Sequence, residues 1–185
     1  MHDISLNSNI IPIISMVVAF DIETTGLDPY KTKVLLVGMK TGRKIKQWKL
    51  WEVQDEAKMI SDALQEVEKI DETIIGYNNL KFDIPFMLER LKILGKYEPR
   101  FFSLYSKKWF DLYQYLGNDY RSLNYWLGQA HIRKKYPDLK GRDMPDFFER
   151  KEFEKIVNHN IDDLRTSEKM FKFLKKMNPK LIPFE

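Results

Sequence analysis

The chain has 185 residues, 43% of them hydrophobic, so it can bury one sizeable core and is expected to form a single domain over residues 1–185. It contains no cysteine, which excludes disulfide bonds, thiolate metal sites and a cysteine nucleophile. The net charge is +4, and residues 165–180 contain six basic residues against the single acid Glu168, which favours an anionic partner.

The first fifteen residues are polar and then apolar around Pro12, and we expect them to form a loose arm before a core of about residues 16–177. The apolar run at residues 10–20 is too short to cross a bilayer and lacks the basic flank of a secretory signal. We therefore expect a cytoplasmic protein with no membrane partner.

Three strands are expected next, as a hairpin-linked meander. The first begins at Met16 and ends in FDIETTGL, residues 20–27. The second covers residues 33–40, and the third covers residues 44–51, where apolar side chains alternate with polar ones.

A helix with Asp55 as its N-cap, a short strand at residues 73–77 and a helix at residues 84–94 follow. The first of these helices is a crossover connection, so the fourth strand is expected to run parallel to its neighbour. The carboxyl end of that strand then points to where ligands bind in such sheets.

Residues 97–126 contain eleven aromatic side chains, more than one small core can hide completely. A short fifth strand is expected just before Asp111, then a helix capped by Ser122, a basic loop at residues 131–145 and a long helix at residues 152–176. The expected fold is α/β, a mixed five-stranded sheet flanked by helices.

Two acidic residues, Asp21 and Glu23, lie at the end of the first strand. Because side chains alternate along a strand, both point to the same face and repel each other. A divalent metal with hard oxygen ligands would compensate this repulsion. Thr24, Thr25 and Gly26 follow directly, and their hydroxyls and backbone offer a place to hold a phosphate or a chain end.

Two further acidic sites lie later in the chain. Asp83 comes just before a helix, where an N-cap is the commonest role of an aspartate. On the last helix, about 100° of rotation per residue places Asp162 opposite the apolar stripe, so that it is expected to face solvent. Asp163 falls at the edge of the stripe, beside His159, in the half-buried position that a metal ligand requires.

Taken in order, DIETTG, GYNNLKFD and HNIDD resemble the three exonuclease motifs of the DEDD 3′→5′ exonucleases, the DnaQ-like branch of the ribonuclease H-like fold. The second motif is most similar to the proofreading domains of family B DNA polymerases. The resemblance covers about Met16–Leu174. It implies a ribonuclease H-like sheet and an enzyme that removes nucleoside 5′-monophosphates from the 3′ end of single-stranded nucleic acid.

The resemblance also implies roles for individual residues. Two divalent ions, Mg²⁺ or Mn²⁺, would be held by the four family carboxylates, which correspond to Asp21, Glu23, Asp83 and Asp163. Contacts to the terminal nucleotide and to the single strand would come from Thr24, Thr25, Gly26, Leu27, Asn78 and Phe82.

The histidine departs from both branches of this family, one of which has Tyr-x3-Asp and the other His-x4-Asp in its last motif. This chain has His159-x3-Asp163, the spacing of one branch with the side chain of the other. The resemblance implies that His159 is the general base of the reaction. The alternatives are a surface histidine or a partner that stabilises the helix through Asp163.

Single-stranded DNA is the favoured substrate, and an RNA-trimming 3′→5′ exoribonuclease of the same superfamily is the first alternative. The second is a non-catalytic nucleic-acid-binding domain, which predicts missing carboxylates, whereas all four are present. Proofreading would require a polymerase or another replication or repair partner in trans. Stacking of bases on the aromatic residues of region 97–126 is a weaker hypothesis than core packing. Contact between the basic loop and the nucleic-acid backbone is likewise a weaker hypothesis than a solvated loop, for each of Lys134, Lys135, Lys140 and Arg142.

Overall fold

The computed structural model describes residues 17–117 and 121–181. The expected N-terminal arm and the predicted strand start at Met16 lie outside these residues. Five strands form one sheet in the order β3-β2-β1-β4-β5. Their bounds are β1 Val17–Thr24, β2 Val34–Thr41, β3 Lys44–Lys49, β4 Thr73–Gly76 and β5 Trp109–Asp111.

The sheet is mixed, as the sequence predicted. Strands β1, β2 and β3 form an antiparallel meander, whereas β4 runs parallel to β1 and β5 runs parallel to β4. The carboxyl ends of β1, β4 and β5 therefore meet at one edge of the sheet, where parallel strands in α/β folds present ligand sites. The predicted α/β fold with a mixed five-stranded sheet is confirmed.

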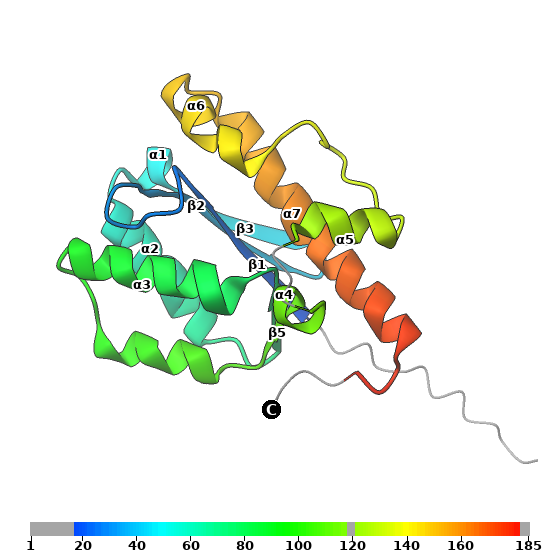
Figure 1. Ribbon diagram of the computed structural model, residues 1–185. Helices are drawn as coiled ribbons and strands as arrows, with labels where there is room; N and C mark the ends of the chain where they lie inside the picture. The colour runs from blue at the N-terminus through cyan, green and yellow to red at the C-terminus, as the bar shows by residue number, and fades with distance from the viewer. Residues whose placement is uncertain (1–16, 118–120, 182–185) are drawn as a thin grey trace, which may run out of the picture.

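Helices cover both faces of the sheet (Figure 1). One face packs against α2 (Glu56–Glu68), α3 (Ile84–Ile93) and the 3₁₀ helix Pro99–Ser106. The other face packs against α5 (Leu123–Gln129) and the long α7 (Phe153–Met177), with α6 (Met144–Glu149) near the start of α7. The remaining short helices are α1 (Leu50–Val53), the π-helical turn η1 (Asn79–Asp83), α4 (Leu112–Tyr115) and a 3₁₀ turn at Gly141–Asp143.

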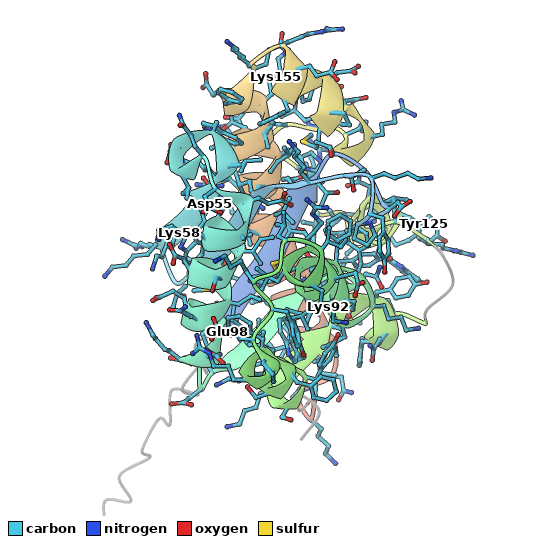
Figure 2. All side chains as sticks on the ribbon, turned by 90° about the vertical axis from the view of Figure 1, so that its left-hand side faces the viewer. Asp55, Lys58, Lys92, Glu98, Tyr125 and Lys155 are labelled. Atoms are coloured by element: carbon cyan, nitrogen blue, oxygen red, sulfur yellow. The ribbon has the colours of Figure 1, made fainter. Side chains whose placement is uncertain are left out.

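Alternation along β1 explains the two layers. Val18 and Phe20 enter the core beneath α2 and α3, whereas Val17 and Ala19 enter the core beneath α5 and α7. The α2 helix begins as the sequence predicts, because Asp55 accepts a hydrogen bond from the backbone N–H of Lys58 at 2.9 Å, both residues being labelled in Figure 2. Because both faces of β1 pack against helices, its first residues are apolar and its polar residues lie at its carboxyl end.

Two predicted boundaries differ from the structure by more than one residue. The third strand ends at Lys49, because it pairs there with Leu36 near the start of β2, and the next residues turn into α1. The basic loop ends at Lys140 rather than at residue 145, because the 3₁₀ turn and α6 follow it.

Candidate active site

A cleft of about 670 Å³ opens at the carboxyl end of β1. Of the residues that the sequence marked as candidates, all except Thr25 and Gly26 line it. The cleft therefore gathers side chains from β1, from the segment after β4 and from α7, three parts of the chain that are far apart in sequence. The candidates that line it are Asp21, Glu23, Thr24, Leu27, Asn78, Phe82, Asp83, His159 and Asp163.

Asp21 and Glu23 face the cleft from the end of β1. Burial raises the pKa of Asp21 well above its usual range, and the nearby charges of Glu23, Asp163 and Asp83 add to the rise. Burial also raises the pKa of Glu23, although a hydrogen bond from His159 opposes the change. Crowding of buried carboxylates is therefore an electrostatic cost that a bound cation would relieve.

Asp83 occupies the N-cap position of α3, but its side chain does not cap the helix. Its backbone is already helical, at φ −58° and ψ −53°, and its side chain makes no capping hydrogen bond. A π-helical turn, η1 (Asn79–Asp83), precedes α3 and directs this carboxylate back to β1, where it accepts a hydrogen bond from the N–H of Ile22 at 3.1 Å. Burial raises the pKa of Asp83 to about 8, although the Ile22 hydrogen bond opposes the rise.

His159 is buried on α7 and is not a surface histidine. Its Nδ1 lies 2.8 Å from Oε1 of Glu23 and 3.7 Å from Oδ2 of Asp163. Burial works to lower the pKa of the imidazole, but the hydrogen bond to Glu23 and the negative charges of Glu23 and Asp163 together outweigh it, so the pKa of His159 is raised. The histidine thus joins the carboxylates of β1 to that of α7.

Asp162 is a correction to the sequence analysis, because it does not face solvent. Only 4% of its surface is exposed, and its two carboxylate oxygens accept hydrogen bonds from the N–H groups of Lys135 at 3.0 Å and Tyr136 at 2.7 Å. The loop that follows α5 folds over this side of α7. Helical phase correctly separates Asp162 from Asp163, but it does not reveal what covers the outer face.

Lys134 also differs from its expected place in a solvated loop. Its side chain is only 8% exposed, and its ammonium group forms an ion pair with Oδ1 of Asp163. Lys135 is exposed, with Nζ over the ring of Tyr136. The two neighbouring lysines therefore have opposite environments, which their identical side chains give no means to predict.

Asn160 on α7 holds the carboxylate of Asp21 in place by a hydrogen bond. Its amide donates a hydrogen bond to Oδ2 of Asp21 at 2.9 Å and accepts one from the side chain of Gln47 at 2.9 Å. The space exists because residue 38 is glycine, since a Cβ there would lie 2.0 Å from Oδ1 of Asn160. The sequence signal was a polar residue within the apolar stripe of the last helix.

A second asparagine supports the other side of β1. Asn79 is fully buried and donates to the carbonyl of Phe20 at 3.2 Å, in space left by Gly76. Asp111, at the end of β5, accepts hydrogen bonds from the N–H groups of Asn78 and Leu80 and thereby fixes the turn that carries Asp83. These supporting residues were missed, because their partners come from other parts of the chain.

The loop after β1 uses its hydroxyls for its own structure. Thr24 donates to the carbonyl of Gly26 at 2.7 Å, and Thr25 accepts from the N–H of Lys33 at 2.9 Å. Leu27 is 81% exposed beside the cleft, and the ring of Phe82 packs against Phe86. The structure therefore brings Thr24, Leu27 and Phe82 to the cleft but places Thr25 and Gly26 outside its lining.

The donor groups suit a divalent cation. One ligand atom from each of Glu23, His159 and Asp163 lies within 4.8 Å of the others. The carboxylates of Asp21 and Asp83 line the same cleft. Carboxylate oxygens are the ligands that Mg²⁺ and Mn²⁺ prefer, and the mutual repulsion noted above favours a positive occupant.

The chain matches the family model described as the RNase_H superfamily over residues 18–175. It is 36% identical over 87 residues to DNA polymerase 2 of Aeropyrum pernix, a match that covers 43% of this chain and 10% of that polymerase. Its fold resembles the family B DNA polymerase from the hyperthermophilic archaeon Pyrobaculum calidifontis with a TM-score of 0.68 and 21% identity, over 88% of this chain and 24% of that chain. The chain therefore spans a small fraction of both polymerases, and the predicted resemblance is confirmed.

Within residues 17–117 and 121–181, no helix combines the length and apolar character that crossing a bilayer requires.

Proposed function

Because the chain belongs to the RNase H superfamily, we propose that it is a metal-dependent 3′→5′ exonuclease acting on single-stranded DNA. The observation that carries the proposal is the convergence of four carboxylates in one cleft, from three separate segments of the chain. These are Asp21, Glu23, Asp83 and Asp163. Hydrolysis of the 3′-terminal phosphodiester would release a nucleoside 5′-monophosphate.

In this proposal the four carboxylates hold two Mg²⁺ or Mn²⁺ ions. When bound, such ions supply electrophilic stabilisation of the phosphate and of the leaving 3′-oxygen. The protein keeps the ligands in place, since Asn160 donates to Asp21 and the N–H of Ile22 donates to Asp83. Positioning of this kind lowers the reorganisation required during the reaction.

His159 is the proposed general base, acting through Nε2. Its Nδ1 is taken by Glu23, at 2.8 Å, which orients the ring and favours the tautomer with the proton on Nδ1. The other nitrogen is then an acceptor for the proton of the attacking water. The raised pKa of the imidazole supports the alternative of an orienting role, so the two are separated by experiment below.

Aromatic and apolar side chains at the mouth of the cleft support a single-stranded substrate. Tyr77, Phe82 and Tyr113 line it together with Leu27, and bases stack on such rings with little sequence preference. The polymerases that the chain resembles favour DNA over the exoribonuclease alternative. A proofreading role would place a polymerase or another replication or repair protein as a partner in trans.

The test is digestion of 5′-labelled single-stranded DNA and RNA of the same sequence, with Mg²⁺ or Mn²⁺ and with excess chelator. We expect a ladder that shortens from the 3′ end, nucleoside 5′-monophosphate as product and no activity in chelator. A faster reaction on RNA would favour the exoribonuclease. Activity that survives the chelator, or cleavage only at internal positions, would contradict the proposal.

A further inference from the structure

Lys134 places a positive charge inside the carboxylate cluster. Its ammonium group pairs with Oδ1 of Asp163, and its charge also acts on Asp21 and Glu23. The ion pair is largely buried, with side-chain exposures of 8% for the lysine and 18% for the aspartate. A buried pair of this kind is costly to break, because removing one partner leaves the other charge uncompensated.

The backbone that directly follows the lysine is also fixed to α7. Asp162 accepts hydrogen bonds from the next two N–H groups of the loop, those of Lys135 and Tyr136. The backbone of Asp162 is itself fixed in α7, where its carbonyl accepts a hydrogen bond from Oγ1 of Thr166 at 2.7 Å. Asp162 and Asp163 are neighbours on one helix, so the first clamps the loop whose lysine contacts the second.

We propose that Lys134 is a tethered counter-ion of the carboxylate cluster, that Asp162 is the residue that positions it, and that a divalent cation must displace its ammonium group from Asp163 in order to bind. The inference rests on the proposed role of Asp163 as a metal ligand. Lysine suits the task because it is a compact charge on a flexible stem, able to move aside while its backbone stays clamped. The tethered charge competes with the metal, so it stabilises the metal-free protein and weakens metal binding.

The experiment measures Mn²⁺ binding by calorimetry and the melting temperature in chelator, for the wild type and matched variants. Lys134→Met should bind Mn²⁺ more tightly, by on the order of tenfold, because a positive charge is removed from beside the site. It should also melt at a lower temperature in chelator. Lys134→Arg keeps the charge and should bind Mn²⁺ nearly as the wild type does. Lys135→Met removes the neighbouring, exposed charge and is the matched control, expected to leave Mn²⁺ affinity unchanged.

The positioning role of Asp162 is tested by asking whether its effect on Mn²⁺ affinity requires Lys134. In Asp162→Asn, an NH₂ group replaces one of the two accepting oxygens, so one loop N–H group loses its acceptor and the clamp is weakened. This variant should also bind Mn²⁺ more tightly than the wild type, and the double variant with Lys134→Met should bind Mn²⁺ no more tightly than Lys134→Met alone. A purely structural role for Asp162 would instead weaken Mn²⁺ binding or add to the effect of Lys134→Met.

Unchanged or weaker Mn²⁺ binding in Lys134→Met overturns the tethered counter-ion, even when the wild type digests DNA and the proposed function stands. If Lys134→Met does not fold without metal, Asp162→Asn provides the same comparison, and unchanged affinity there overturns the clamp. A wild type that binds no Mn²⁺ overturns this inference and the metal-dependent function together.

Discussion

Asn160 on α7 donates a hydrogen bond to the carboxylate of Asp21 on β1 at 2.9 Å, through a gap that only a glycine at position 38 leaves open. The contact crosses from a helix to the centre of the sheet, since β1 lies between β2 and β4. Because the amide donates to the charged form, it favours an ionised Asp21 against the effects of burial. The packing of Asn160 against Gly38 therefore affects the ionisation of Asp21 in the cleft.

Gly38→Ala is expected to lower both stability and activity. The new Cβ would lie 2.0 Å from Oδ1 of Asn160, so the amide must move and its hydrogen bond to Asp21 is lost. Overpacking of this kind costs about 1–3 kcal/mol of the free energy of unfolding, which denaturant titration measures. Gly128→Ala is the control, because nothing lies within 4 Å of its added Cβ and alanine is the better helix former.

Asn160→Ala in the Gly38→Ala background restores the missing space. The double variant should therefore be more stable than the sum of the two single losses predicts, although it should not regain activity. Strict additivity of the two stability changes would contradict the steric account.

Asp21→Ala is expected to leave the fold intact and to abolish activity. The substitution removes a buried carboxylate that repels its neighbours, and this relief should offset the loss of the hydrogen bond from Asn160, so the melting temperature in chelator should change little. Mn²⁺ should raise the melting temperature of the wild type but hardly that of the variant, because a ligand is lost. Asp71→Ala, which changes an exposed acid between α2 and β4, controls for the loss of one negative charge. An equal Mn²⁺ effect on the wild type and Asp21→Ala would remove Asp21 from the metal site.

Stability of the metal-free protein should fall as the pH rises from about 4 to about 8. The pKa of Asp83 is raised to about 8 in the folded protein, so in this window the folded state binds a proton that the unfolded state has released. The stabilisation from protonated Asp83 is complete below the pKa that this group has in the unfolded state, and it is lost as the pH rises through the pKa of the folded state. Asp83→Asn keeps an acceptor for the Ile22 N–H but cannot titrate. It should reduce, without removing, the pH dependence of the melting temperature measured in chelator, because the raised pKa values of Asp21 and Glu23 act in the same direction. An identical slope in the variant would show that another group is responsible.

Local signals in the sequence predicted most of the fold. Apolar runs identified β1 and β2, alternation identified β3, capping residues located α2 and α5, and the pairing of Asp21 with Glu23 on one face followed from the strand period alone. The convergence of the acids with Asp163 and His159 came from the resemblance to known exonucleases, since no local pattern specifies which part of a helix lies beside which strand end.

The sequence did not predict the burial of side chains that are covered by a loop from another part of the chain. Helical phase separates Asp162 from Asp163, but the burial of Asp162 is caused by the loop that donates to it from Lys135 and Tyr136. The same loop buries Lys134 and leaves Lys135 exposed. Burial on an outer helix face is a tertiary property, so it has no periodic signature.

The last prediction concerns His159, where two roles give different outcomes. If the histidine is the general base, His159→Ala should lower the rate by about 10² to 10⁴ with substrate binding nearly unchanged. Alanine also breaks the hydrogen bond to Glu23, at 2.8 Å, so it does not by itself separate proton transfer from positioning. A wild-type rate in this variant would exclude both roles.

Two further variants make the separation. His159→Asn has a donor near the place of Nδ1 and can keep the hydrogen bond to Glu23, but it has no acceptor corresponding to Nε2. His159→Tyr restores the residue that accompanies this spacing in the other branch of the family. If the imidazole accepts the proton, single-turnover rates of both variants should be as low as that of His159→Ala. If the position only orients Glu23 and the attacking water, His159→Asn or His159→Tyr should recover a substantial part of the rate, and the general base must then be sought elsewhere.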